Sequence, residues 1–286
     1  MENIIQDINA TLSNYGIAER ISAWDVTITD KTVSDYAKPV SKLSDCITNC
    51  LWPSIQSATV YHYTQWDAAA SILGSNTFRL GNIEKRFGED EIVAFCETHQ
   101  LCGYLAPDAD GSPRYKTLLM PNTFYASFTE SNLSTNEEEY FWRNFAAADG
   151  IRLTLRIEAS NPNFRHVRYE KKPGLPIPIL AELSELIRTK YRREFILSGI
   201  SRLCAFYLPE AKYGNEKEYR LMCKTVKDIG PQPIGNGATS YVEFPLGVMT
   251  EFGYKLEILD VCANSQPKMR VNYPFTVRGS SSANRA

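Results

Sequence analysis

The stretch SATVYHYTQWDAAASILGSNTFR, residues Ser57–Arg79, decides how the rest of the chain is organised. β-Branched and aromatic residues alternate over Ala58–Tyr63, which predicts a strand. Small and apolar residues at helical spacing follow before Gly74, and they predict a short helix that leads into a second strand. Thr64 is expected to cap this helix, with Asp67 three residues later as its capping-box partner.

His62 stands at the carboxyl end of the predicted strand, between two tyrosines. Because strand side chains alternate, His62 and Thr64 share one face, and Tyr61 and Tyr63 share the other. A histidine at such a corner can line a pocket. A lone histidine is more often a hydrogen-bonded packing residue, at odds of roughly two in three. Both interpretations stay open at this point.

The remaining sequence predicts an α+β fold, because half-buried alternating strands are interspersed with helices. The most regular strand pattern is Ile151–Glu158, and the longest predicted helix is Leu180–Leu197. We predict an N-terminal helical extension over 1–55, a main domain over 56–277 and a flexible tail over 278–286. Further helices are predicted over 1–20, 34–51, 89–105 and 136–148, and further strands over 122–128, 166–170, 203–208, 218–223, 241–246 and 254–261.

Composition narrows the class of protein. The chain has 286 residues, of which 43% are hydrophobic, and a net charge of -2, so a globular protein is expected rather than one with a large nucleic-acid-binding surface. No apolar run approaches the roughly 20 residues of a membrane span, and the N-terminus does not resemble a secretion signal. Seven cysteines without framework spacing favour a location in the reducing cytoplasm.

A metal site is not predicted. Cys96, His99 and Cys102 are close in sequence, but on one helix Cys96 and Cys102 would point about 240° apart, so they would not converge on one ion. Glu218 and Arg220 are two positions apart and therefore lie on the same face of a predicted strand. Taken alone they are most simply a solvated pair of charges, again at roughly two in three.

Four segments in one order resemble a known family. They are YHYT (61–64), FYASFTE (124–130), FWRNFAAADGIRLTL (141–155) and NEKEYRL (215–221). Together they resemble the bacterial domain-of-unknown-function 2971 family, over roughly residues 60–225. The chain departs from the family pattern where GEDE (88–91) stands for a longer acidic segment, where Phe145 replaces a tyrosine and where Tyr219 replaces a tryptophan.

That family in turn resembles the ADP-ribosyltransferase fold, a split antiparallel β-sandwich that holds NAD in a cleft. The resemblance implies that Glu218 is the catalytic carboxylate, with Glu216 as the first member of a Glu-x-Glu pair that holds or deprotonates the acceptor. His62 would bind a ribose hydroxyl. The remaining cofactor-binding residues that it implies are Tyr63, Thr64, Tyr125, Ser127, Trp142, Arg79 and Arg220, with an aromatic ring for nicotinamide and an arginine for the pyrophosphate.

The implied reaction breaks the nicotinamide–ribose bond and transfers ADP-ribose to a protein or nucleic-acid acceptor, as a bacterial toxin or phage-defence effector would. A carboxylate beside the ribose would stabilise the oxocarbenium character that builds up as this bond breaks. Two alternatives remain. One is a metal-dependent nuclease or hydrolase that uses Glu216, Glu218 and the Glu89–Glu91 cluster. The other is a non-catalytic module that binds a nucleotide or a peptide.

Overall fold

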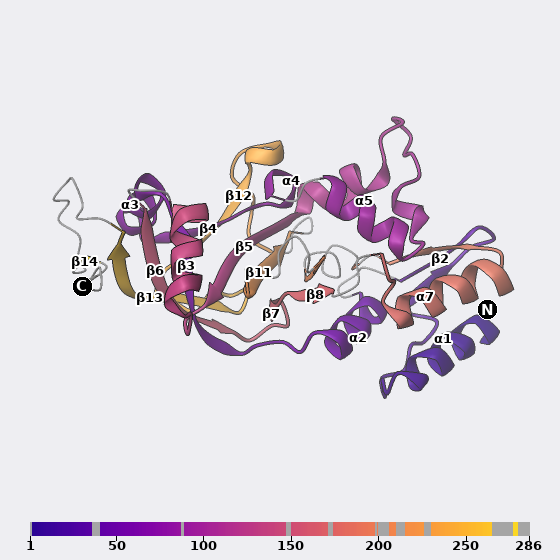
Figure 1. Ribbon diagram of the computed structural model, residues 1–286. Coiled ribbons are helices and arrows are strands. Elements are labelled where there is room, and N and C mark those ends of the chain that lie inside the picture. Colours follow the sequence, from indigo (N-terminus) through magenta and orange to yellow (C-terminus); the bar gives the residue numbers. More distant parts are fainter. Residues whose placement is uncertain are drawn as a thin grey trace.

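The computed structural model describes residues 2–35, 41–86, 89–146, 150–170, 174–197, 199, 206–209, 215–225, 230–264 and 277–279. These residues form a mixed α+β fold with a mostly antiparallel nine-stranded sheet and two smaller sheets of three and two strands. The large sheet occupies one end of an elongated molecule, and most of the helices lie at the other end (Figure 1). The predicted α+β class, antiparallel sheet and flanking helices are confirmed.

The large sheet is built around β5 (Thr123–Glu130), which pairs with three other strands and is the point where the sheet branches. The strands run in the order β12 (Tyr241–Pro245), β4 (Thr77–Asn82), β5, β3 (Ser57–Thr64), β6 (Ile151–Ala159), β13 (Tyr254–Ala263) and β14 (Val277–Gly279). Off this path, β11 (Glu218–Lys224) pairs with β5 and with β7 (Phe164–His166).

The sheet forks along β5. One edge of β5 pairs with the whole of β11, from Thr129 opposite Glu218 to Thr123 opposite Lys224. The other edge is shared, because β4 pairs with it at Phe124 and Tyr125, and β3 pairs with it at Thr129 and Glu130. In the described part of the chain, no strand pairs with the three residues between, 126–128, on that edge. The strand–helix–strand unit predicted from the sequence therefore spans the fork.

The two branches of the sheet enclose one apolar core. Phe78 and Phe244 from one branch, and Leu155 and Leu256 from the other, are all at most 1% exposed within it. Helix α3 (Trp66–Ser75), which joins β3 to β4, adds buried apolar residues to the same core. Each such side chain that becomes fully buried contributes about 1.5–3 kcal/mol relative to an exposed one. Strand β6 alternates buried and partly exposed residues, as predicted.

A second core lies among the helices. The sequence predicts an apolar stripe of Ile4, Ile5, Ile8 and Leu12 on α1 (Glu2–Asn14), and the structure buries all of it there except Ile5, which is partly buried. Residues of α2 (Lys42–Leu51), α5 (Glu89–Thr98) and α7 (Pro178–Glu185) share this core. The N-terminal segment is not purely helical, because β1 (Val26–Ile28) and β2 (Thr32–Asp35) form a small sheet with β9 (Glu194–Ile196). The segment before residue 55 shares this core with residues as distant as Met222.

Arg165 on β7 links the large sheet to the helical part of the molecule. Its guanidinium is completely buried, and it donates hydrogen bonds to the Trp52 carbonyl and to Asn49 Oδ1 at the end of α2. A buried arginine at this place supplies both donors and positive charge to the carbonyls that end a helix. Helix α2 is thereby tied to the strand beside β11.

Several predicted boundaries differ from the structure. The helix predicted over 34–51 begins at Lys42, because the preceding residues Thr32–Asp35 pair as a strand. The helix predicted over 180–197 ends with a π-helical turn at Lys190, because residues 194–196 pair with β2. A local apolar pattern shows which residues are buried but does not exclude a strand. Here the pairing of β2 with β9 favours strand at residues where the pattern predicted helix.

The predicted helix caps also moved. Gln65, not Thr64, is the N-cap of α3, and Asn76 with φ 53° ends this helix instead of Gly74. Helix α6 (Thr135–Phe141) is capped by Ser134 through a capping box with Glu137, where Asn136 was predicted. Predictions on Pro39, on a turn at residues 213–214 and on residues 280–286 of the tail lie outside the described residues.

The smaller remaining elements complete the described fold. They are α4 (Ile83–Arg86), β8 (Arg168–Glu170), which pairs in parallel with β10 (Tyr207–Pro209), and short 3-10 or π turns.

Candidate functional site

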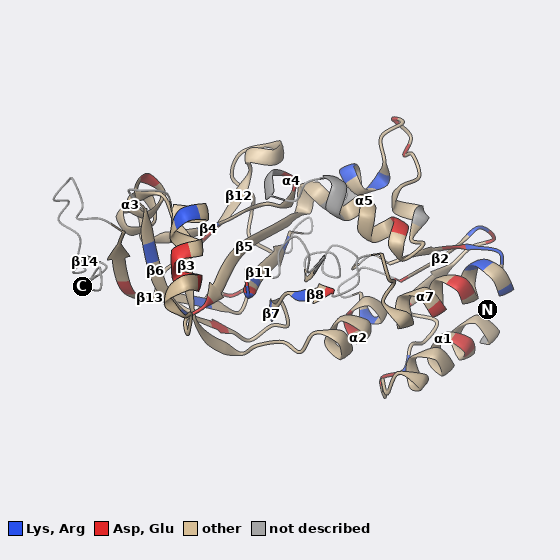
Figure 2. Ribbon diagram, viewed as in Figure 1, with Lys and Arg blue, Asp and Glu red and all other residues tan. Residues whose placement is uncertain are grey.

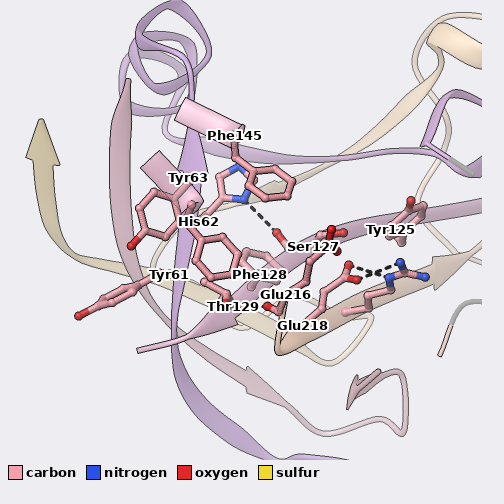
Figure 3. Close-up of a pocket in the computed structure, with 12 residues that line it drawn as sticks. Tyr61, His62, Tyr63, Tyr125, Ser127, Phe128, Thr129, Phe145, Glu216 and Glu218 are labelled. Carbon is pink, nitrogen blue, oxygen red and sulfur yellow. Dashed lines mark hydrogen bonds and ion pairs between the residues drawn. The ribbon is translucent and has the colours of Figure 1, made fainter. Parts of the chain in front are cut away.

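A cavity of about 310 Å³ lies at the fork of the sheet (Figure 3). Strand β3 contributes Tyr61, His62 and Tyr63, and β5 contributes Tyr125, Ser127, Phe128 and Thr129. Strand β11, which pairs with β5, and the residues just before it contribute Glu216, Glu218 and Arg220. Segments that are far apart in sequence therefore form one cavity, and His62 and Glu218 both line it.

His62 closes the fork. Its ring Nδ1 lies 3.0 Å from the carbonyl oxygen of Ser127, one of the three β5 residues at the fork. A carbonyl oxygen only accepts, so this contact assigns the proton to Nδ1. The ring also packs against Phe78 and Phe128, with centroids 5.2 and 5.6 Å away. His62 is thus both a packing residue and a cavity-lining one.

Glu218 and Arg220 form a buried ion pair. Arg220 Nε donates to Glu218 Oε1 at 2.7 Å, and the second guanidinium nitrogen donates to Glu218 Oε2 at 2.9 Å. Glu218 is 4% exposed and Arg220 is 5% exposed, so the interpretation as a solvated pair of charges is wrong. Both faces of β11 are buried, because Leu221 packs in the sheet core and Met222 in the helical core.

The two hydrogen bonds make the ion pair bidentate, and a bidentate arginine–carboxylate pair is among the stronger charge-assisted hydrogen-bond arrangements. The Arg220 guanidinium also lies 5.1 Å from the centre of the Tyr125 ring, over its face. Arg220 stands between Ser127 on β5 and Arg165 on β7 in the strand register. The carboxylate therefore meets a firmly placed cation within the cavity wall.

The backbone before Glu218 is held from three sides. The Glu218 amide donates to the Tyr169 hydroxyl at 2.8 Å, and the Thr129 hydroxyl donates to the Glu216 carbonyl at 2.9 Å. Burial, followed by the nearby Glu218 charge, raises the pKa of the Tyr169 hydroxyl. Lys217, with a left-handed φ of 41°, forms ion pairs with Glu130 at 2.8 Å and Glu137 at 2.7 Å. These contacts fix the entry into β11 against β5 and against the first turn of α6.

Aromatic rings from α6 and the following turn form another wall. Phe141 stacks on Tyr63 with centroids 5.3 Å apart, and Phe145 stacks on Phe141 at 5.7 Å. Phe145 is 44% exposed, which leaves part of its ring available to a bound molecule. The sequence prediction missed both phenylalanines as lining residues. Their spacing of four residues on a helix was the signal that could have found them.

Three predicted cofactor-binding residues lie away from the lining of this cavity. Trp142 is 9% exposed and packs edge-on against Tyr63 at 5.0 Å, so it supports the aromatic wall from behind. Arg79 on β4 pairs with Glu243 at 2.7 Å and lies over the Tyr241 ring. Thr64 is the last residue of β3, one position beyond the lining residue Tyr63. The other predicted residues are brought together.

The other polar residues singled out in the sequence have structural surroundings. His99 is completely buried and does not line the cavity at the fork. Its Nδ1 lies 2.7 Å from the Phe95 carbonyl oxygen. The side chains of Glu89–Glu91 lie outside the described residues. Among the side chains that the structure describes, no group of three or more His, Cys, Asp or Glu is arranged to hold a metal ion. Within the same described part, no helix is long and apolar enough to cross a membrane.

Comparisons with models of protein families, with curated proteins and with solved structures found no match to this chain.

Proposed function

We propose that this protein is an NAD-dependent ADP-ribosyltransferase that breaks the nicotinamide–ribose bond and passes ADP-ribose to a macromolecular acceptor. The observation that carries the proposal is that His62 and Glu218 line one cavity at the fork of an antiparallel sheet, together with exposed aromatic surface. Ser127 and Tyr125, which were expected beside them, line the same cavity. The forked sheet is the arrangement expected for a split antiparallel fold of this kind.

The chemistry assigns a role to each wall. As the C–N bond to nicotinamide lengthens, the bond electrons leave with the nicotinamide ring and positive charge builds on the ribose. The Glu218 carboxylate stabilises that charge, and Nε2 of His62 accepts a hydrogen bond from a ribose hydroxyl. Glu216 takes the proton from the acceptor group as its new bond to the ribose forms. The Phe145 ring offers a stacking surface for the nicotinamide.

Arg220 holds the Glu218 carboxylate in place. Its guanidinium donates two hydrogen bonds to the two carboxylate oxygens, and this bidentate pairing fixes the direction in which the carboxylate faces. Its position in the same wall also makes Arg220 the arginine of choice for the pyrophosphate, in preference to Arg79. Binding of a phosphate group would then share the guanidinium between the two anions.

A test of the proposal uses purified protein with NAD labelled separately in its nicotinamide and adenylate parts. Released nicotinamide reports bond cleavage, and adenylate label on an added protein or nucleic-acid mixture reports transfer. We expect cleavage by the wild type and a loss of at least 100-fold in Glu218→Gln, of the order seen when one transition-state-stabilising group is removed. Glu243→Gln is the matched control, because Glu243 also pairs with an arginine but stands on β12. No nicotinamide release by the wild type under any acceptor condition would overturn the proposal.

A non-catalytic nucleotide-binding module is the second candidate. It is favoured by the buried ion pair, because Arg220 occupies both oxygens of the Glu218 carboxylate. This candidate predicts that NAD binds wild type and Glu218→Gln alike, without release of nicotinamide from either. The same pairing does not favour Glu218 as a metal ligand, and adding a chelator to the labelled-NAD reaction tests the metal-dependent alternative.

A further inference from the structure

A second cavity of about 340 Å³ lies among the helices, and it shares no lining residue with the one at the fork. Its walls come from the residues that follow α5, from α7 with its π-helical extension, and from the start of β9. Gln100, Ser184 and Phe195 represent these three segments. The charged side chains on its walls are Arg188, Arg193 and Glu194.

One of the three charged side chains on these walls, Arg193, has no ion-pair partner among the described residues. Arg188 pairs with Glu185 on its own helix, and Glu194 pairs with Arg114 at 3.7 Å. Arg193 is half-buried, and no acidic residue of the described chain lies within ion-pair distance of its guanidinium. A partly buried charge without a counter-ion is unfavourable, and an arginine in that position is suited to an oxyanion with two acceptor oxygens.

Two helices end beside this cavity. Gln100 with φ 56° follows α5, and Arg192 with φ 53° follows the π-helical extension of α7, and a left-handed residue is a common way for a helix to end. Arg192 directly precedes Arg193, and the Arg193 amide donates to the Ile187 carbonyl. The end of this helix therefore fixes the backbone at Arg193. Basic residues also mark the last turn of the α7 extension, as the charge colouring of Figure 2 shows.

We propose that this cavity is a second ligand site, which binds a small molecule through an oxyanion group, phosphate or carboxylate, paired with Arg193. The Ser184 hydroxyl donates to the His99 carbonyl at 3.0 Å, so it belongs to the cavity's frame. The Gln100 amide and Arg188 are the further polar groups that meet the ligand. Phe195 supplies apolar surface for its body. The proposal does not depend on the activity at the fork.

The test is calorimetric titration of the full chain with inorganic phosphate and, separately, with citrate, each against sodium chloride of equal ionic strength. The two arms distinguish a phosphate-bearing ligand from a polycarboxylate. We expect one anion to bind the wild type, and Arg193→Gln to weaken its binding at least 10-fold. Arg192→Gln is the matched control, because Arg192 is the exposed neighbour and does not line the cavity.

Two further variants make the outcome decisive. Arg193→Lys keeps the charge without the planar fork of donors, so it should weaken binding less than Arg193→Gln. Glu243→Gln should leave anion binding unchanged, because Glu243 lines neither cavity. The proposal is overturned if neither anion binds beyond the sodium chloride reference. It is equally overturned if Arg192→Gln loses as much binding as Arg193→Gln, or if Glu243→Gln abolishes it.

Discussion

The imidazole of His62 takes the place of a strand partner for Ser127. At the fork, β3 and β4 separate along one edge of β5, and the Ser127 carbonyl would face that gap. The His62 Nδ1 contact at 3.0 Å satisfies it. A backbone carbonyl left unpaired in a partly buried position is costly, so this histidine is a structural part of the opening that forms the cavity.

The first prediction concerns this contact. His62→Phe keeps a ring against Phe78 and Phe128 but leaves the Ser127 carbonyl without its donor. We expect a loss of about 1–3 kcal/mol in the free energy of unfolding, measured by urea denaturation at pH 7.5. His166→Phe is the control, because His166 is exposed and stacks on Tyr219, and it should change stability by less than about 0.5 kcal/mol. Equal effects of the two variants would refute a special role for the His62 contact.

The second prediction concerns the buried ion pair. Glu218→Gln leaves the Arg220 charge buried without its partner, so we expect the unfolding free energy to fall by about 3 kcal/mol. The double variant Glu218→Gln with Arg220→Gln should recover at least half of that loss, because the uncompensated charge is gone. Nicotinamide release should stay absent in both, which separates chemistry from stability. A Glu218→Gln protein as stable as the wild type would show that the pair contributes nothing to folding.

The third prediction distinguishes two aromatic residues. Phe145→Ala removes exposed ring surface, so stability should change by less than about 0.5 kcal/mol while the KM for NAD rises about 3- to 10-fold through lost stacking. Trp142→Ala removes a buried ring and should cost about 3–5 kcal/mol of stability. If instead the conservative Trp142→Phe raises the KM and Phe145→Ala does not, the stacking surface is Trp142. This prediction depends on the proposed NAD chemistry.

The fourth prediction concerns pH. Burial lowers the pKa of His99, and its ring packs against Phe95 and Tyr207. The folded state therefore binds fewer protons than the unfolded state once the pH falls to the ordinary histidine pKa of about 6.5, and folding stability must decrease on acidification through that value.

The measurement is the urea midpoint at pH 7.5 and at pH 5.5, for the wild type and for His99→Gln. The variant should show a smaller decrease between the two pH values. Some decrease should remain, because the His166 ring packs on Tyr219 on one side, and the resulting loss of solvation also lowers the pKa of this otherwise exposed residue. An unchanged decrease in the variant would show that His99 does not carry the effect.

Much of the fold follows from local pattern. The alternation of β6 and the apolar stripe of α1 each match the face that is buried, because these periods depend only on strand and helix geometry. The strand that carries Glu218 was also found at its observed start. Boundaries such as the start of α2 were missed where a strand from another part of the chain competed with helix, as β2 does through its pairing with β9.

The site itself divides in the same way. The amino-acid sequence determined which residues have the chemistry, namely a histidine at a strand end, a carboxylate two positions before an arginine and aromatic residues on a short helix. Only the tertiary structure decided that the carboxylate and arginine are buried, because β11 lies between two cores that no local pattern reveals. It also decided that His62 faces Ser127, since that contact arises where two strands part along a third. Strand pairing joins residues distant in sequence, and the energy that selects one pairing comes from packing across the whole molecule.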